Sequence, residues 1–396
     1  MRHHIVVLGA GYAGTSSAGY LARHLHRDDF EITVVNAEPD FVERLRLHQL
    51  AAGKDLRRHE LADIFADTGI ALRIGAVTAI DLERKVITMT EGRQATQLEY
   101  DTLLYTLGST IAEHDVAGVP EHAMHIAGQS SALRLRHRLD ELGDQGSVLV
   151  VGGNLTAIEG ATEIADRRPG LRVTLATDGE LGGWLGPKAR AHLYRAFDRL
   201  GIAVHEHTSI KRVTATGAIA ADGTTFAADA TVWAAGFATH PIAAASGLAV
   251  EDNGQITVDR MMRSVSHPDV YAAGDSAYAI GTNGLPLPMT CATAGFTGRQ
   301  ATSAIIGELT GRKAAKTALV YPGNCISLGQ RDGLLQIVDG EARSKSWAVR
   351  GWLAARIKAG VLRGTVWNQR NPTYGLPARK YRRSSAAERD NEAVNA

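Results

Sequence analysis

The sequence contains very few cysteines, with only Cys291 and Cys325 among 396 residues. Two cysteines that lie 34 positions apart exclude a disulfide framework and a CxxC pair, and they fit a reducing cytosol. The N-terminus leads directly into an apolar run, without an h-region or cleavage site, so we expect no signal peptide and a cytoplasmic protein. Two stretches without Asp, Glu, Lys or Arg, 230–250 and 276–298, carry Gly, Pro, Thr or Asn, so neither predicts a transmembrane helix.

An excess of charge of one sign is also missing. The 43 Lys and Arg residues balance 42 Asp and Glu residues, which leaves a formal net charge of +1. No broad basic face follows from this balance, so we do not expect nucleic-acid binding. His205-Glu206-His207 presents two imidazoles on one face of a strand, but further ligands are missing and we expect no metal site. The chain is too long for a single hydrophobic core, so its length predicts two or three domains.

Glycine is plentiful, and five of the 42 glycines belong to two similar turns. The first turn, Gly9-Ala10-Gly11-Tyr12-Ala13-Gly14, follows a short β-branched run and precedes apolar residues at helical spacing. In such an arrangement Gly9 permits the tight turn, Gly11 lets a pyrophosphate approach the backbone, and Gly14 allows helix and strand to pack. The N–H groups of the helix N-terminus then face the phosphates. This turn predicts a dinucleotide site.

The second turn stands 143 positions later and departs from the pattern. In Gly152-Gly153-Asn154-Leu155-Thr156-Ala157, the alanine at the third glycine position is tolerated. Asn154 replaces the second glycine, whose missing side chain admits the pyrophosphate. Either this side chain turns away, since Asn adopts positive φ more readily than most residues, or it blocks the dinucleotide. The turn favours nucleotide binding and leaves the alternative open.

Strands with small residues at their ends recur after each turn. The segments 99–109 and 230–236 lie roughly 80 to 100 residues after their own glycine turns, as two βαβ-based nucleotide units in tandem require. A third segment, 268–275, is another strand and closes on Gly-Asp. We therefore predict an α/β fold with two Rossmann-like dinucleotide-binding domains and a C-terminal extension.

The order of these motifs resembles the two-dinucleotide-domain flavoproteins of the pyridine nucleotide-disulfide oxidoreductase superfamily, and most of all the bacterial FAD-dependent oxidoreductases related to type II NADH dehydrogenases. The motifs are the first turn, Tyr100-Asp101-x-Leu103-(x)3-Leu107-Gly108-Ser109, the second turn, Trp233-Ala234-Ala235-Gly236 and Asp269-Val270-Tyr271-Ala272-Ala273-Gly274-Asp275, with similar stretches at 41–49, 325–329 and 331–336. The resemblance extends over residues 1–367. The close cysteine pair of the disulfide reductases is absent, so a dithiol mechanism is not expected.

The resemblance implies a division of the chain into four parts. An FAD-binding domain would consist of residues 1–113 and 245–312, interrupted by an NAD(P)H-binding domain at 114–244. Residues 313–396 would form a C-terminal region with a basic, tryptophan-containing segment and a flexible tail.

For FAD, the resemblance implies that the first turn binds the pyrophosphate, Asp275 the ribityl chain, and the Val77 backbone the adenine. Asn36 stands where an acid usually binds the ribose, and it keeps hydrogen-bonding capacity without the charge. A helix that opens near 289–292 would direct its positive end at the isoalloxazine ring. The residues assigned to FAD are Gly9, Gly11, Tyr12, Ala13, Gly14, Asn36, Ala37, Arg46, Val77, Thr106, Gly108, Asp275, Cys291 and Ala292. Resemblance alone places Arg46 and His48 at the flavin pocket.

The second turn would hold NADH or NADPH for hydride transfer to the flavin N5, with Gly152, Gly153, Asn154, Thr156 and Gly236 as the assigned residues. Glu159 is the candidate catalytic residue, because the family places a glutamate here near the nicotinamide and the flavin. It would either orient the nicotinamide carboxamide or relay protons, and the alternative is a solvated helix residue. The strand 171–176 is followed by Thr177-Asp178, where an acid favours NADH. Asp178 stands one place late, so this preference is mild.

Acidic residues are absent from residues 342–386, which contain eleven Lys or Arg and three of the five tryptophans, Trp347, Trp352 and Trp367. Basic residues with tryptophans suit an anionic membrane surface, and type II NADH dehydrogenases have a C-terminal anchor of this kind. Val349, Leu353, Ile357 and Val361 predict an apolar helical stripe, although Arg350 and Lys358 fall near it. Peripheral membrane contact through 342–383 stays open beside packing on the flavin domain or a partner subunit, with disorder beyond Tyr374.

We therefore predict an FAD-dependent oxidoreductase that takes hydride from NAD(P)H and passes electrons to a second acceptor, with a quinone as the leading candidate. One alternative is a flavoenzyme of specialised metabolism that acts directly on an organic substrate with weak or no nicotinamide binding, which Asn154 motivates. Another is a non-catalytic flavin-binding interaction protein. The expected location is the cytoplasm or the cytoplasmic face of the membrane, and a homodimer is left open.

Overall fold

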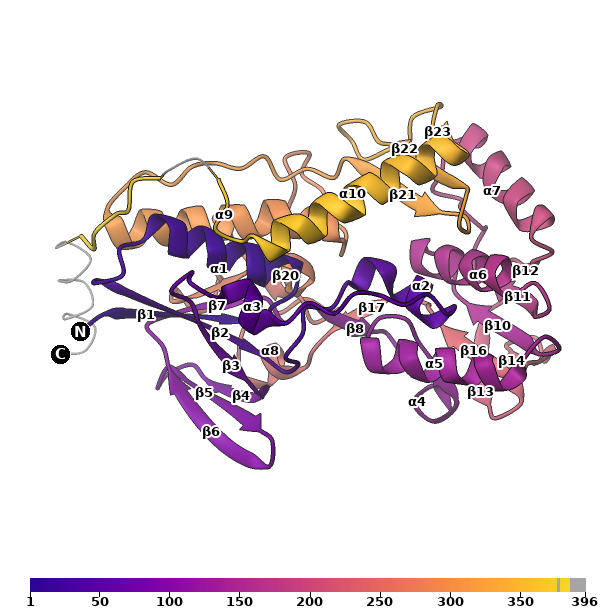
Figure 1. Cartoon of the computed structure of the whole chain (residues 1–396), viewed down its shortest axis with the longest axis horizontal. Coiled ribbons are helices and arrows are strands. Elements are labelled where there is room, and N and C mark those ends of the chain that lie inside the picture. The colour runs from indigo at the N-terminus through magenta and orange to yellow at the C-terminus, as the bar shows by residue number, and fades with distance from the viewer. Residues whose placement is uncertain (376–377, 385–396) are drawn as a thin grey trace.

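The computed structural model describes residues 1–375 and 378–384, and its two largest sheets are built alike (Figure 1). The first sheet has the order β19-β7-β1-β2-β3 and the second β12-β11-β10-β16-β9, and all neighbouring strands are parallel. The first contains β1 (His3–Leu8), β2 (Phe30–Asn36), β3 (Ala71–Ile74), β7 (Thr102–Tyr105) and β19 (Val270–Ala272); the second contains β9 (Ala123–Met124), β10 (Ser147–Val151), β11 (Arg172–Ala176), β12 (Ala203–His205) and β16 (Ala230–Trp233). This repetition confirms the two predicted Rossmann-like units.

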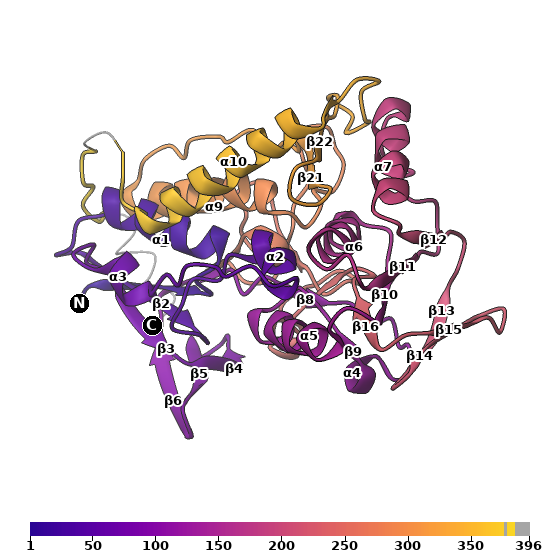
Figure 2. The ribbon, with the colours of Figure 1, turned by 45° about the vertical axis from the view of Figure 1, so that its right-hand side comes forward.

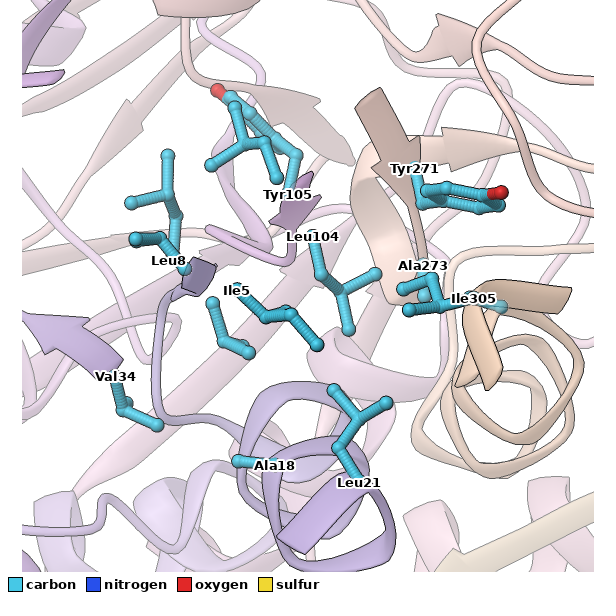
Figure 3. Packing of buried hydrophobic residues seen from close by; sticks show 14 of the residues in the cluster. Ile5, Leu8, Ala18, Leu21, Val34, Leu104, Tyr105, Tyr271, Ala273 and Ile305 are labelled. Atoms are coloured by element: carbon cyan, nitrogen blue, oxygen red, sulfur yellow. The ribbon is translucent and has the colours of Figure 1, made fainter. Parts of the chain in front are cut away.

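The central strand of each sheet leads into a glycine turn and is buried on both faces. Ile5, Val6, Val7 and Leu8 of β1 have no exposed surface, as expected for a parallel sheet covered by helices. Figure 3 shows the core beside this strand, where α1 (Tyr12–His24) and α9 (Cys291–Thr310) pack their apolar residues against the sheet. The turn between β1 and α1 therefore lies at the carboxyl edge of the sheet, where such folds bind ligands.

Helices of the second unit flank its sheet in the same way, with α5 and α6 close to its central strands (Figure 2). The other helices are α2 (Leu47–Ala51), α3 (Leu61–Phe65), α4 (Val119–His122), α5 (Gln129–Leu142), α6 (Leu155–Arg167), α7 (Pro187–Arg199), α8 (Ile242–Ala245) and α10 (Trp352–Arg370), with 3-10 turns η1 (Arg44–Arg46) and η2 (Gly274–Ser276). Of these, α3 and α8 contribute residues to the first core. Although α2 follows β2 of the first unit, Leu47, Leu50 and Ala51 belong to the core of the second. The two units are therefore interlocked through α2.

Smaller sheets connect and decorate the two units. Antiparallel β8 (Ser109–Ile111) and β17 (Phe237–Thr239) form the crossover between them. The other small sheets are β4 (Ala76–Asp81), β5 (Val86–Glu91) and β6 (Gln94–Glu99); β13 (Ile210–Thr214), β14 (Gly217–Ala220) and β15 (Thr225–Ala227); β18 (Ile256–Thr257) with β20 (Ala277–Tyr278); and β21 (Gly323–Ser327), β22 (Gly333–Ile337) and β23 (Val349–Arg350).

The C-terminal helix α10 runs along the outside from α1 to β21 and β22 (Figure 1). A helix was predicted here, but its apolar stripe was placed wrongly. Val349 lies in β23 before the helix begins, and Leu353 and Val361 are exposed. The buried face consists of Ala354, Lys358, Leu362 and Gln369. Packing on β21 and α6 selects this face, and a pattern of apolar residues in the sequence does not reveal it.

The chain beyond α10 returns to the first unit. A Cβ on Gly19 of α1 would lie 2.2 Å from the Pro372 carbonyl oxygen, so the two segments touch closely. Tyr381 donates its N–H to the His24 carbonyl at 2.7 Å, and Arg382 forms ion pairs with Asp28 and Asp29. The expected disorder beyond Tyr374 is therefore wrong for 378–384, and the rest of that tail lies outside the described residues. Within the described chain, no helix has the length and apolar content needed to cross a membrane.

Candidate functional site

The first glycine turn leaves its helix N-terminus open. Gly9 has φ of +94° and a Cβ there would lie 2.5 Å from the Thr106 carbonyl oxygen, while a Cβ on Gly14 would lie 1.8 Å from the Gly9 oxygen. Close backbone packing therefore requires both glycines. A Cβ on Gly11 would meet nothing within 4 Å, and no side chain caps α1. The N–H groups at this end of α1 consequently face open space, as an anion site requires.

Residues from neighbouring strands hold this turn in place. The Asn36 Oδ1 accepts the Ala10 N–H at 2.8 Å, and its Nδ2 donates to the Glu38 carbonyl at 2.7 Å. The Thr106 hydroxyl donates to the Leu8 carbonyl at 2.7 Å. Asn36 thus supports the turn itself, a role that its position at the end of β2 did not reveal. The predicted contact of Asn36 with the ribose stays a prediction.

Asp275 belongs to a polar cluster with two residues that sequence analysis did not single out. Its Oδ2 accepts the Ser109 hydroxyl at 2.6 Å and lies 3.8 Å from the Arg44 Nη1. The Arg44 guanidinium also lies 5.8 Å from the centre of the Phe237 ring. Arg44 follows β2, Ser109 begins β8 and Phe237 begins β17, so this cluster joins the first unit to both crossover strands. The signal for Arg44 was its place in the segment 41–49, two residues before Arg46.

The other residues assigned to FAD lie around this region. Gly274 has φ of +71°, and a Cβ there would lie 3.1 Å from the Ala13 Cβ, so the Gly-Asp turn touches α1. Gly108 donates its N–H to the Ser276 hydroxyl at 2.9 Å. Val77 lies on β4, which starts beside Asn36, because Gly75 donates to the Asn36 carbonyl at 2.8 Å. Arg46 forms an ion pair with Glu43 at 2.9 Å, which gives its side chain a protein partner. Tyr12 packs edge-on against Phe41, and Ala37 is exposed.

The helix expected near 289–292 begins at Cys291, with Thr290 as its capping residue. Both cysteines are free. Although Cys291 keeps exposed surface, the surrounding protein and the Asp275 carboxylate raise the pKa of its thiol to about 11. Burial likewise raises the pKa of Cys325 to about 11. Both thiols are therefore protonated at neutral pH, which disfavours nucleophilic thiol chemistry.

The second glycine turn has the same backbone but an occupied helix N-terminus. Asn154 has φ of −81° and ψ of 177°, so the expectation of a positive φ is wrong. Its Oδ1 accepts the Ala157 N–H at 3.0 Å, and its Nδ2 donates to the Ala234 carbonyl at 2.8 Å. Asn154 is thus the N-cap of α6, a role for which asparagine is among the best residues. Its side chain satisfies an N–H group that α1 leaves open.

A small pocket adjoins this turn. Asn154, Thr156 and Gly236 line it together with Phe237, Ile111 and Ile126. Three residues predicted to bind the nicotinamide dinucleotide therefore come together, and apolar residues of the two crossover strands complete the wall. Gly152 packs on the Ala234 carbonyl and Gly153 on the Thr177 side chain, where added Cβ atoms would lie 2.3 Å away in both cases. A side chain at either position would collide with these neighbours, so the path of the turn requires both glycines.

Glu159 is buried on α6 and forms an ion pair with Lys358 of α10. The Glu159 Oε1 that accepts from the Lys358 ammonium also accepts the Ser327 N–H at 2.7 Å. The Lys358 Nζ donates in addition to the Cys325 carbonyl at 2.9 Å. Glu159 is therefore not the solvated helix residue of the alternative interpretation. Lys358 stands 199 positions away, and only its isolation among small and apolar residues marked it in the sequence.

No metal site is formed by the described residues. His205 ends β12 and packs edge-on against Phe226 at 4.9 Å between ring centres. His207 lies beyond the strand with φ of +51°, so the two imidazoles are not alternate residues of one strand.

The two turns, one open and one capped, are the arrangement expected for two dinucleotide sites. A family model covers the part of the chain that contains both turns. The model described as pyridine nucleotide-disulphide oxidoreductase matches residues 3–298. The chain belongs to this family, which confirms the predicted family, fold and oxidoreductase class.

Relatives of known name share the architecture over most of the chain. An NADH dehydrogenase-like protein of Mycobacterium tuberculosis is 27% identical over 77% of this chain and 80% of its own. A type II NADH:quinone oxidoreductase of Staphylococcus haemolyticus is 26% identical over 84% and 89%. Among solved structures, the sulfide:quinone oxidoreductase of Aquifex aeolicus superposes with a TM-score of 0.78 at 20% identity, covering 93% of this chain and 92% of that one. This superposition shows that the two chains have the same fold.

Proposed function

We propose that the chain is an FAD-dependent NADH:quinone oxidoreductase. The observation that carries this proposal is the pair of parallel five-stranded units, each with a glycine turn at a helix N-terminus, one open and one capped. Such a difference suits a resident cofactor at the open turn and an exchanging co-substrate at the capped one. The relatives named as NADH dehydrogenase-like and type II NADH:quinone oxidoreductases support the choice of donor and acceptor.

The residues of the first unit fit FAD. The open N-terminus of α1 and the empty space at Gly11 suit a pyrophosphate, and the Asp275 carboxylate suits the ribityl hydroxyls. When bound, FAD supplies the two-electron chemistry that side chains lack. Arg44 and Ser109 orient Asp275, and α9 directs its positive end toward the same region. The thiols are not required.

The residues of the second unit fit NADH less tightly. The N–H groups of Leu155 and Thr156 remain for a pyrophosphate, while Asn154 occupies that of Ala157. Ile111 and Phe237 of the two crossover strands lie beside Asn154 and Thr156 and offer apolar surface to a nicotinamide ring, although the cavity between them is only about 10 Å³. Glu159 presents one carboxylate oxygen to Lys358 and Ser327, which leaves Oε2 for the nicotinamide carboxamide. We assign Glu159 this orienting role.

The outer face of α10 supports a membrane location for the acceptor. Trp352 is 65% exposed and Trp367 49%, and the exposed Arg356, Arg363 and Arg370 lie on the same helix. No acidic residue interrupts it. Tryptophan and arginine side chains together bind the interface of an anionic bilayer. A quinone dissolved in that bilayer would be within reach of a protein resting on this face.

Anaerobic stopped-flow mixing with NADH and NADPH tests the donor. Flavin absorbance that bleaches within seconds supports the proposal, and absence of bleaching with both nucleotides would contradict it in favour of an organic substrate or a non-catalytic flavoprotein. Turnover with a soluble quinone then tests the acceptor.

Vesicle flotation tests the membrane face. Removing the C-terminal region would also remove Lys358, so we use Trp352→Ala with Trp367→Ala, which leaves the buried face of α10 intact. The double variant is expected to lose binding to anionic vesicles while its quinone activity in solution persists. Leu133→Ala, at an exposed apolar residue of α5, is the matched control. Unchanged binding of the double variant would exclude α10 as the contact.

A further inference from the structure

A buried polar cluster lies where three parts of the chain meet. His48 comes from α2, Glu159 from α6 and Lys358 from α10. Each is at most 6% exposed. The helices belong to the interlocking segment, the second unit and the C-terminal region, and α2 touches α6 directly. Three polar side chains from separate segments do not converge in a core without a shared purpose or a considerable cost.

The two oxygens of Glu159 have different surroundings. Oε1 accepts from the Lys358 ammonium and from the Ser327 N–H. Oε2 makes no hydrogen bond to any described residue, and the His48 Nδ1 lies 3.9 Å from it. One side of the carboxylate is therefore fixed by donors, and an imidazole nitrogen faces the other side.

The burial of His48 at this position is energetically unfavourable. Its Nε2 is buried without a hydrogen-bond partner in the described structure. Burial is the first cause that holds the pKa of His48 well below 6.5, and the positive charges of Lys358, Arg46, Arg167 and Lys54 lower it further. The imidazole is therefore neutral. A buried nitrogen without a partner destabilises the fold, so leucine would be the more favourable residue if packing were the only requirement.

We propose that His48 is a positioning residue for Glu159, which carries its hydrogen on Nδ1 and directs it at Oε2. The carboxylate then has Lys358 and Ser327 as hydrogen-bond donors at Oε1. At 3.9 Å from Oε2 the imidazole N–H acts as an electrostatic contact and not as a hydrogen bond. Oε2 therefore keeps its capacity to accept a hydrogen bond from the nicotinamide carboxamide. This assignment rests on the proposed function in one respect, that Glu159 orients the nicotinamide. A carboxylate beside a neutral imidazole favours the tautomer that turns N–H toward it. The opposite nitrogen then stays an unused acceptor, as observed.

Three variants separate this role from packing. His48→Asn places an amide N–H where Nδ1 lies, whereas His48→Gln places it where Nε2 lies, and His48→Leu removes both. We expect His48→Asn to keep the rate and pH profile of flavin bleaching by NADH. His48→Gln and His48→Leu should slow it roughly tenfold to a hundredfold and move the acid limb to higher pH, because a carboxylate that loses this N–H contact is protonated more readily. Equal profiles for all three variants would overturn the proposal.

Folding and donor chemistry are checked independently. Thermal unfolding should show His48→Leu at least as stable as the parent, since it removes an unpaired polar group. Nitrogen-15 NMR of histidine-labelled FAD protein, with His48→Asn for assignment, reports the tautomer without NADH. A neutral imidazole with hydrogen on Nδ1 supports the proposal even if NADH does not bleach the flavin, and hydrogen on Nε2 or a protonated ring at pH 6 would overturn it.

Discussion

The two glycine turns follow one backbone path and differ in the group that occupies the helix N-terminus. Gly11 and Asn154 precede α1 and α6 with φ of −78° and −81°. At α1 no side chain caps the helix, whereas Asn154 binds the Ala157 N–H and fastens the turn to Ala234. Because the fold is the same, the grip on a pyrophosphate depends on the N–H groups left free. One unit is thereby suited to a resident cofactor and the other to an exchanging one.

The difference continues one turn farther along each helix. Because the two turns are 143 residues apart, Ser16 of α1 stands at the position equivalent to that of Glu159 in α6. The Ser16 hydroxyl donates to the Tyr12 carbonyl of its own helix at 2.7 Å. Glu159 instead binds Lys358 and Ser327 of the C-terminal region. At this helix position only the second unit therefore carries a titratable side chain, and two residues of the C-terminal region are its hydrogen-bond partners.

The largest expected effect comes from giving the first turn the cap of the second. In Gly11→Asn the new side chain meets no protein atom near its Cβ, so folding should persist. The amide should cap α1 and occupy the space of the FAD pyrophosphate. We expect FAD affinity to fall about a hundredfold, or ~2.8 kcal/mol, which is the loss of two hydrogen bonds to a charged group. Flavin fluorescence on titration of apoprotein measures it.

Gly11→Ala is the control, because a methyl group cannot cap a helix. Its loss of affinity should be the smaller of the two. Equal retention of FAD by the parent and Gly11→Asn would show that a cap at this position does not compete with a pyrophosphate.

The reverse change should open the second turn. In Asn154→Gly the Ala157 N–H becomes available, and one regained charge-assisted hydrogen bond corresponds to about tenfold tighter NADH binding. The lost cap should lower the free energy of unfolding by only a few tenths of a kcal/mol. Equilibrium binding of NADH to the oxidised FAD protein, with a slowly reacting analogue, gives the dissociation constant. Asn154→Asp keeps the cap and adds a negative charge, so it should bind more weakly than the parent. The same affinity in all three would remove Asn154 as the determinant.

The local features of this comparison could be predicted from the sequence, and its contacts could not. Apolar runs and glycine spacing predicted β1, β10 and both turns, because strands and turns depend on neighbouring residues. The role of Asn154 was misjudged, since the left-handed preference of asparagine was weighed and its capping preference was not. Lys358 and His48 depend on partners more than a hundred residues away in sequence. Their burial becomes visible only when α2, α6 and α10 are packed together.

A pH dependence should come from Lys358, which α10 places against Glu159 of the second unit. Burial lowers the pKa of Lys358 from 10.5 to about 7. Between these values the unfolded chain binds the lysine proton and the folded chain releases it, so this group makes the free energy of unfolding rise with pH. Below pH 7 both states are protonated and the cost of the buried charge is fully present. Denaturant unfolding of the parent and Lys358→Met at pH 7, 8 and 9 should show a difference that changes by about 1 kcal/mol per pH unit in favour of the parent. A difference that is constant with pH would mean that Lys358 keeps its proton throughout this range.

The smallest expected effect concerns the ribose ends of the two turns. In the first sheet β1 pairs with β2 up to Val35, and in the second β10 pairs with β11 up to Ala176. The next residues, Asn36 and Thr177, therefore occupy equivalent positions, and Asp178 stands one place later. Asp178 is exposed and has no ion-pair partner among the described residues, whereas Glu180 is paired with Arg190 at 2.7 Å. An exposed charge near a 2′-phosphate contributes about 1 kcal/mol, so Asp178→Asn should reduce the preference for NADH over NADPH about fivefold in stopped-flow bleaching. Glu180→Gln, which removes a charge already neutralised by Arg190, should change it less. If the two variants behave alike, discrimination does not depend on the charge at this edge. The two turns would then be alike in this respect, because in neither unit would a carboxylate contribute to recognition of the ribose, whether Asn36 or Asp178 stands beside it.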